Sequence, residues 1–260
     1  SDIDSFSIGW NPAINLEAMN IPQNGQARFL GEIFYNVANP LINLSSPAGN
    51  ISEQIIHLEN KKKIHIFFVR HHLAHAASYY LSGFSKSAIV TLDAFGEKQC
   101  CHVAVGSKNK IETIWSQEFP HSLGSFYSAF TSFLGFKPQS DEWKLMGASA
   151  YGNPKRYLKK IEKIFTINEE GFEIDLSLFN HYQFHRPGLF LNKLSQLVGI
   201  MPNENGRPLN KNYYDLAASV QYVFEQICIN LFQKINRKTR MQNLVFSGGC
   251  ALNSVLNGKI

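Results

Sequence analysis

The sequence predicts an α/β protein in which a mixed sheet is flanked by helices. Three observations support this fold class: consecutive strand patterns over residues 88–117, a long amphipathic helix over 213–235, and a strand–glycine–helix unit over 243–256. With 260 residues, of which 44% are hydrophobic and 17% charged, the chain can bury a core, and its composition excludes the disordered and fibrous classes. No apolar run reaches about 18 residues, so we expect no membrane span.

The first third of the chain is expected to alternate short strands and helices. Residues 6–10 are typical of a short strand, 26–37 carry apolar residues at helical spacing, and 52–58 are predicted to form a second short helix. The apolar and β-branched run over 64–69 indicates a buried strand. The alanines over 71–81 favour a helix directly after it.

The middle of the chain is predicted to be an antiparallel meander. Strand patterns occur over 88–93, 101–106 and 111–117, and the second and third are separated by turn-forming residues at 107–110. A helix is expected to follow over 122–134.

The remaining residues predict two helices, an insertion and a final strand. An Asn-Pro pair at 153–154 is typical of a helix start. Residues 166–212 are irregular and rich in Asn, Pro and Gly, which indicates an insertion or a lid. After the long helix, a strand over 243–246 leads through a tight turn at 247–249 into a helix over 251–256.

This order of elements corresponds to one repeat unit of the actin/hexokinase/Hsp70 type, a ribonuclease H-like fold in which two units close on a nucleotide. We therefore expect an incomplete fold of this type. Residues 1–87 would form part of a first lobe that ends in the helix at 71–81. Residues 88–260 would form a second lobe, truncated at its C-terminus, in which the first turn of the meander and the diglycine turn point into the cleft.

Two histidines one helical turn apart are candidate metal ligands. His71 and His75 would lie within about 40° of each other on the helix surface, so one ion can bind both rings. His72 would point elsewhere. No glutamate follows the first histidine, which distinguishes the pattern from the metalloprotease HExxH. The alternative is a helix with three solvated or core histidines.

Acidic residues and a glycine follow the first strand of the meander. Asp93 lies where this strand ends, and a carboxylate there can ligate a metal or a metal-bound water. Gly96 would let the backbone approach a phosphate, and Glu97 would act on a water or a hydroxyl. A simple hairpin turn with solvated acids is the alternative.

Two further segments are candidates for ligand binding. In the Ser247-Gly248-Gly249 turn the glycines lack Cβ atoms and the following helix presents unpaired amides, as in phosphate or nucleotide cradles. A plain glycine turn fits the same residues. Glu142 and Lys144 flank a tryptophan, and Lys144 can hold a phosphate oxygen, although this segment alone is uninformative.

Five segments, taken together and in order, resemble the carbamoyltransferase family: HHLAHAASYY, TLDAFGE, SLGSFYSAFTSFLGF, DEWKLMGASAYG and FSGGCALNSVLNGKI. They span residues 71–260. Members of the family include nodulation-factor and antibiotic O-carbamoyltransferases. The histidine pair and the fold also resemble, more distantly, the tRNA threonylcarbamoyl-transfer enzymes.

The resemblance implies an enzyme with a two-stage reaction. Carbamoyl phosphate and ATP would form carbamoyl-adenylate in a separate C-terminal YrdC-like domain of the same full-length protein. The N-terminal domain would then transfer the carbamoyl group to a hydroxyl of a small-molecule or glycan acceptor. It also implies a divalent metal, iron with zinc as the alternative.

The resemblance assigns roles to particular residues. The implied metal ligands are His71, His75 and Asp93. It places Ser247, Gly248, Gly249 and Asn253 along the nucleotide, and Glu142 and Lys144 in the cleft. Together with the residue pattern, this predicts Gly96, Glu142, Ser247, Gly248, Gly249 and Asn253 as cofactor-binding residues. The predicted catalytic residues are Asp93, Glu97 and Lys144.

The sequence departs from the family pattern in three respects. Ala94 stands where the family has glycine, and Ser149 and Ala150 replace an Ala-Pro pair. Family members begin with an earlier strand-rich segment, and they continue past residues 257–258 to a further aspartate ligand. We therefore expect the chain to be an inactive fragment that does not make carbamoyl-adenylate by itself.

Charge and cysteine usage bound the partners and the compartment. The net charge of +5 is dispersed, which predicts no nucleic-acid partner and disfavours a tRNA threonylcarbamoyl-transfer relative. A non-catalytic nucleotide-binding module is a further alternative, which the histidine pair disfavours. The cysteines fit neither a zinc site nor a disulfide framework, so we expect a reduced cytoplasmic protein. They are Cys100, Cys101, Cys228 and Cys250.

Overall fold

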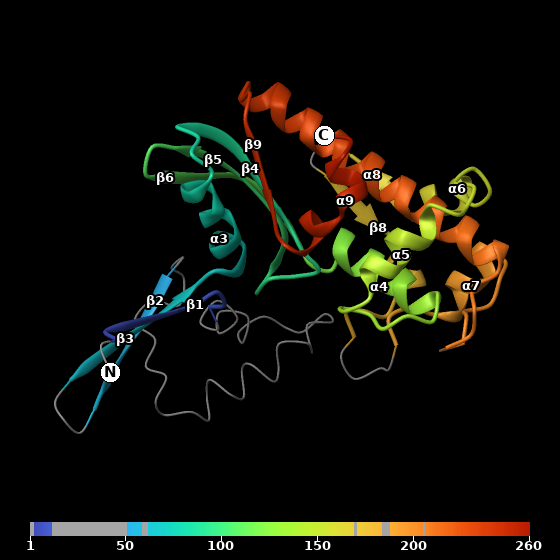
Figure 1. Cartoon of the computed structure of the whole chain (residues 1–260), viewed down its shortest axis with the longest axis horizontal. Coiled ribbons are helices and arrows are strands. Elements are labelled where there is room, and N and C mark those ends of the chain that lie inside the picture. Colours follow the sequence, from blue (N-terminus) through green and yellow to red (C-terminus); the bar gives the residue numbers. More distant parts are fainter. Residues whose placement is uncertain (1–2, 12–50, 59–61, 169–170, 184–187, 205) are drawn as a thin grey trace.

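The computed structural model describes residues 3–11, 51–58, 62–168, 171–183, 188–204 and 206–260. The described chain is an α/β protein with mixed sheets flanked by helices, as the sequence predicts (Figure 1). The two larger sheets lie toward one side of the molecule and helices α4 to α7 toward the other, while α8 (Lys211–Thr239) runs from these helices across to β9 (Leu244–Ser247). The predicted helix over 26–37 lies outside the described residues.

The first sheet has three strands in the order β1-β3-β2. Strand β1 (Ser5–Ile8) runs parallel to β3 (Lys63–Val69), and β2 (Ile51–His57) runs antiparallel to it. The prediction of a helix over 52–58 is therefore wrong. Strand β2 pairs with β3 along its whole length, from Ile51 opposite Val69 to His57 opposite Lys63, and this long-range pairing overrides the local pattern.

The second sheet contains the predicted meander and the final strand, in the order β6-β5-β4-β9. Strands β4 (Lys86–Leu92), β5 (Gln99–Ser107) and β6 (Lys110–Glu118) are antiparallel, which confirms the meander. Strand β9 (Leu244–Ser247) runs parallel to β4. The two strands therefore end at the same edge of the sheet, where Asp93 and the diglycine turn follow them.

Side chains alternate across β4, and each face of the sheet has its own helices. Ala88, Val90 and Leu92 join the main core with α4 (Leu123–Phe133) and α8. Ile89 packs on the opposite face, with Ala76 and Tyr79. The predicted helix over 71–81 is divided there into α3 (His71–Ala76) and a 3₁₀ turn over Ala77–Leu81.

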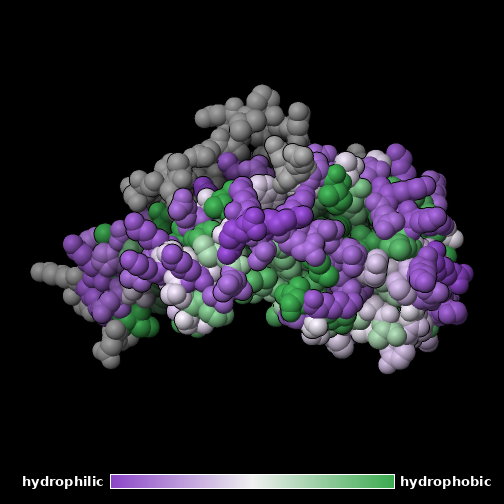
Figure 2. Space-filling model, turned by 90° about the horizontal axis from the view of Figure 1, so that it is seen from above, coloured by the Kyte–Doolittle hydropathy of each residue, from purple (hydrophilic) through white to green (hydrophobic). Residues whose placement is uncertain are grey.

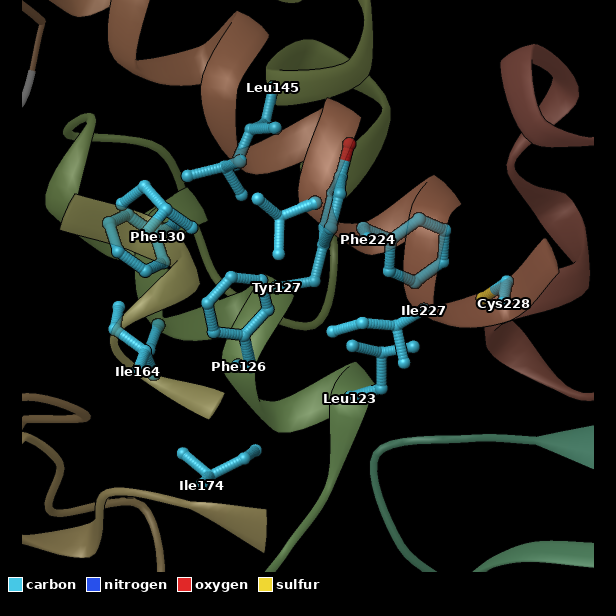
Figure 3. Close-up of a cluster of buried hydrophobic side chains, with 14 of the residues drawn as sticks. Leu123, Phe126, Tyr127, Phe130, Leu145, Ile164, Ile174, Phe224, Ile227 and Cys228 are labelled. Atoms are coloured by element: carbon cyan, nitrogen blue, oxygen red, sulfur yellow. The ribbon is translucent and has the colours of Figure 1, made fainter. Parts of the chain in front are cut away.

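Helix α8 (Lys211–Thr239) confirms the strongest helical prediction and extends it at both ends. The side chain of Asn210 caps its first turn, and Arg240 ends it in the left-handed conformation, with φ of 56°. Its apolar face meets side chains of α4 and of α5 (Glu142–Ser149) in one buried cluster (Figure 3). Phe126, Tyr127 and Phe224 are among the labelled members of this cluster.

The segment predicted to be irregular contains several short elements that pack on the main core. They are β7 (Phe165–Ile167), β8 (Phe172–Ile174), a 3₁₀ turn over Leu176–Leu178, and α7 (Asn192–Val198). The helix expected to begin at the Asn-Pro pair, before this segment, is α6 (Leu158–Glu162), which begins at Leu158. The residues before this helix, 153–157, form turns instead, and the buried Asp215 of α8 holds them by accepting hydrogen bonds from the amide of Asn153 and from the side chain of Arg156.

The chain closes with a 3₁₀ turn over Gly249–Leu252 and the short helix α9 (Ser254–Asn257), so the predicted helix over 251–256 is interrupted. Asn253 causes the break, because its side chain caps the amide of Leu256. Hydrophilic side chains cover much of the face seen in Figure 2, with hydrophobic ones between them. Within the described residues, no helix is long and apolar enough to cross a bilayer.

Candidate metal centre and adjoining cavity

Helix α3 begins directly after β3, and a buried carboxylate holds its first turn. The amide of His71 donates to Glu97 at 3.0 Å (Oε1) and 3.2 Å (Oε2). The amide of Asn11 donates to the same Oε1 at 2.6 Å, and Glu97 is only 3% exposed. A carboxylate at this position satisfies an orphan helix amide and complements the positive end of the helix dipole. Glu97 thus fixes where α3 starts.

Two imidazoles of α3 and the carboxylate after β4 converge. The Nε2 atoms of His71 and His75 are 3.1 Å apart, and each lies 3.1 Å from Oδ2 of Asp93. Their side chains are 23%, 32% and 22% exposed, respectively. Among the described residues these three form a group whose ligand atoms all lie within 4.8 Å of one another. The structure therefore brings together the three residues predicted to bind metal.

Hydrogen bonds and charge within this group shift the pKa values of Asp93 and His71 in opposite directions. Burial opposes the charge of Asp93, but hydrogen bonds from His71, His75 and the amide of Ala94 hold its pKa well below the usual range. Burial also opposes protonation of His71, yet the hydrogen bond and the charge of Asp93 raise the pKa of His71. Without a metal, protonation of His71 and ionisation of Asp93 therefore favour each other.

The second ring nitrogen of His71 determines how the ring is oriented. Its Nδ1 lies 3.2 Å from the carbonyl of Gly9, and a carbonyl can only accept, so Nδ1 carries the hydrogen. In the neutral ring the lone pair of Nε2 then faces Asp93 and His75. Trp10 packs edge-on against His71, with ring centroids 5.7 Å apart. Histidine ligands of metals are commonly oriented by such a bond to a carbonyl.

His72 faces away from this group, as predicted, and is buried against the sheet. Its Nδ1 lies 2.6 Å from the hydroxyl of Thr91, and its Nε2 lies 3.0 Å from the carbonyl of Gln99. Burial lowers the pKa of His72 to about 3, so the ring is neutral at ordinary pH.

The diglycine turn lies against the end of β4. Gly248 has φ of +93°, and a Cβ atom there would lie 2.3 Å from the carbonyl oxygen of Leu92. A Cβ on Gly249 would lie 3.0 Å from Oδ1 of Asp93. Gly248 is therefore needed for the close approach of this turn to β4, and a side chain at position 249 would crowd the carboxylate of Asp93. The hydroxyl of Ser247 donates to the carbonyl of His75 at 2.9 Å, which ties the turn to α3 as well.

A cavity of about 520 Å³ opens beside the three residues. Of the predicted site residues, those that line it are His71, Asp93, Glu142, Gly249 and Asn253. Aromatic and apolar side chains form much of the remaining wall: Trp10, Phe95, Tyr127, Trp143, Met146, Phe224 and Leu252. A smaller cavity of about 190 Å³ shares Ala94, Phe95, Ser128 and Gln139 with this one.

The predicted residues of α5 separate in the structure. Glu142 faces the cavity, where its Oε1 accepts from the hydroxyl of Ser128 and the amide of Gln139, both at 2.6 Å. Lys144 is not among the residues that line the cavity, and its ammonium pairs with Asp141 at 2.9 Å. Gly96 is not among the residues that line the cavity either. It packs against the ring of His72, for which its missing Cβ leaves room.

A buried polar network borders the cavity and was not predicted from the sequence. The amides of Gln221 and Asn253 bond to each other reciprocally, at 2.9 and 3.0 Å. Gln221 also accepts from the hydroxyl of Tyr127 at 2.7 Å and donates to Glu225 at 2.8 Å. Lys259 pairs with Glu225 at 2.5 Å. Polar residues four apart within the apolar stripe of α8 are the only sequence signal of this network.

The pKa shifts of the metal-free group predict a pH-dependent stability. The raised pKa of His71 contributes stability that is complete below about pH 6.5 and is lost as pH rises through the raised value. The lowered pKa of Asp93 contributes stability above about pH 4 that is lost in acid. Asp93→Asn should therefore destabilise the chelator-treated protein more at pH 6 than at pH 8.5, as measured by urea unfolding.

Asp141→Asn is the matched control, because Asp141 pairs with a lysine, Lys144, instead of a histidine. A destabilisation by Asp93→Asn that stays constant or grows toward pH 8.5 would contradict the assignment of the pair.

Comparison with known proteins assigns the chain to a family. Residues 22–260 match the family model described as Carbamoyltransferase N-terminus. An uncharacterized protein of Synechocystis, sll1178, is 35% identical over 75% of this chain and 32% of its own length. The nodulation protein NolNO of Sinorhizobium fredii is 30% identical over 75% of this chain and 27% of its own length. The nodulation protein NolO of Bradyrhizobium diazoefficiens is 30% identical over 74% of this chain and 33% of its own length. The chain thus spans about a third of these relatives, and it belongs to the carbamoyltransferase family.

Proposed function

We propose that this chain is the part of an O-carbamoyltransferase that transfers a carbamoyl group from carbamoyl-adenylate to a hydroxyl of a small-molecule or glycan acceptor. The convergence of His71, His75 and Asp93 at a cavity beside the diglycine turn carries this proposal. Carbamoyl-adenylate would be made from carbamoyl phosphate and ATP by a YrdC-like domain elsewhere in the full-length protein. The compartment we propose is the cytoplasm, where the free cysteines Cys100, Cys101, Cys228 and Cys250 stay reduced.

The three residues fit a divalent metal by their chemistry and spacing. Ligand bonds of about 2.1 Å at right angles put neighbouring ligand atoms about 3 Å apart, close to the 3.1 Å found between each pair of atoms here. Two histidines and one carboxylate are typical of non-haem iron(II) sites that keep open positions. Iron is therefore the metal we propose, with zinc as the alternative. A bound metal would supply a Lewis acid that polarises phosphate and carbamoyl oxygens.

The protein's own groups would hold and orient the reactants. Asp93 and the two histidines keep their positions through Glu97, Gly9 and Ser247, so little reorganisation is needed when a ligand binds. The apolar wall of the cavity would exclude water, which otherwise hydrolyses an acyl-adenylate. Because Glu97 is engaged at the start of α3, we assign it a supporting role; a catalytic role for Lys144 stays a prediction.

The cavity is suited to a nucleotide. Its volume of about 520 Å³ lies within the usual range of about 300–1,000 Å³ for small-ligand sites. Aromatic rings offer stacking surfaces for a base, and Glu142 and Asn253 offer polar groups for its edge or for the ribose. The strand order β6-β5-β4-β9 and the diglycine turn support an actin-like fold with lobes at 1–87 and 88–260, which we also propose.

Metal binding tests the proposal at the three residues. The wild-type chain should bind one Co²⁺, or Fe²⁺ under anaerobic conditions, per molecule. His71→Ala, His75→Ala and Asp93→Asn should each weaken binding by at least about 100-fold, because loss of a ligand exceeds the 10–100-fold typical of outer-shell changes. Calorimetric titration measures the affinity.

His65→Ala is the matched control, since His65 also pairs with a carboxylate, Glu53 at 2.5 Å, but lies on β3 in the three-stranded sheet. Full metal occupancy in a His71→Ala/His75→Ala double variant would refute the ligand assignment.

The diglycine turn gives a second test. Gly249→Ala should weaken the binding of AMP to the metal-loaded chain by about tenfold or more, because the added Cβ meets Asp93 at 3.0 Å beside the cavity. Gly147→Ala on α5 is the control, since its Cβ would meet nothing within 4 Å. Fluorescence or calorimetric titration with AMP measures both. Equal AMP affinity of Gly249→Ala and wild type would contradict the proposed nucleotide site.

A further inference from the structure

Of the three histidines of α3, His72 faces the sheet and is 1% exposed. Because the carbonyl of Gln99 can only accept, the Nε2 of His72 carries the hydrogen and donates to it at 3.0 Å. The neutral ring then accepts the hydroxyl hydrogen of Thr91 at Nδ1, over 2.6 Å. Both ring nitrogens are thus engaged, and the tautomer is fixed by the protein.

Both partners belong to the segment that carries Asp93. Thr91 lies in β4, and Asp93 follows directly after the strand. The side chains of both contact histidines of α3, as expected for positions two residues apart along an extended backbone. Gln99 opens β5, just after the turn that Asp93 begins. On its third side, the ring lies against Gly96, where a Cβ atom would be 2.9 Å from Cδ2 of His72. The ring of His72 is therefore seated between the end of β4 and the turn to β5.

This seating determines the rotation of α3 about its own axis. The helix has only six residues, His71–Ala76, and neighbouring side chains on a helix are about 100° apart. When His72 is held against Thr91 and Gln99, the directions of His71 and His75 follow. A rotation of the helix would carry both Nε2 atoms away from Oδ2 of Asp93.

We propose that His72 is a positioning residue of the metal centre, which anchors α3 to the strand that supplies Asp93. The inference rests on the proposed function, because it assumes that His71, His75 and Asp93 bind a metal. It differs from a role in core packing alone, which would affect stability without affecting metal affinity.

Substitutions of Thr91 test the anchor without touching α3 or a ligand. Thr91→Val removes the hydroxyl at nearly constant volume, and Thr91→Ser keeps it. We expect Thr91→Val to weaken Co²⁺ binding by about tenfold and to change the visible spectrum of the bound Co²⁺, whereas Thr91→Ser stays within about threefold of wild type. Thermal unfolding of the chelator-treated variants gives the separate effect on stability.

Thr113→Val is the control. Thr113 also bonds a histidine, His102 at 2.8 Å, in the same sheet, but it lies on β6, which is separated from β4 by β5. This variant should leave Co²⁺ affinity unchanged. If Thr91→Val does not fold, Gly96→Ala displaces the ring from its other side and should weaken Co²⁺ binding similarly. Wild-type affinity in whichever of these two variants folds overturns the inference. Absence of Co²⁺ binding by the wild type overturns the proposed function, and the inference with it.

Discussion

The hydrogen-bonded contact between Asp93 and two imidazoles of α3 is the constraint on which the site depends. An ionised carboxylate at the end of a buried strand is costly unless charges or hydrogen bonds compensate it. His71 and His75 supply that compensation at 3.1 Å, and the amide of Ala94 adds a third bond at 2.7 Å. The same arrangement leaves three ligand atoms facing one point at the cavity wall.

Much of the surrounding structure serves to hold α3 in place. Glu97 receives its first amide, Ser247 bonds the carbonyl of His75, and His72 is seated between β4 and β5. These partners come from four places along the sequence: β4, the β4–β5 turn, the start of β5 and the end of β9. Parallel pairing of β9 with β4 is what brings them to one edge of the sheet. The fold thus prepares the site before any ligand arrives, as preorganised sites require.

The parts of the site that follow from local spacing could be predicted from the sequence. Histidines four residues apart predict a shared helix face, and alternating strands with turn residues predict the meander. What depends on partners far along the chain could not be predicted. From its place in a turn, Glu97 is predicted to act on a water or a hydroxyl. Only the fold shows that its carboxylate accepts hydrogen bonds from the amides of His71 and of Asn11, which is 86 residues away. The helix predicted over 52–58 is a strand in the structure for the same reason, because the conformation of β2 comes from its pairing with β3.

A crystal structure of the chain grown or soaked with Fe²⁺ or Co²⁺, with anomalous scattering recorded at the metal edge, tests the central claim most directly. We predict a single strong peak bonded to Nε2 of His71, Nε2 of His75 and a carboxylate oxygen of Asp93, at about 2.0–2.2 Å. A peak bound elsewhere, with these three side chains still hydrogen-bonded to one another, would contradict the proposal.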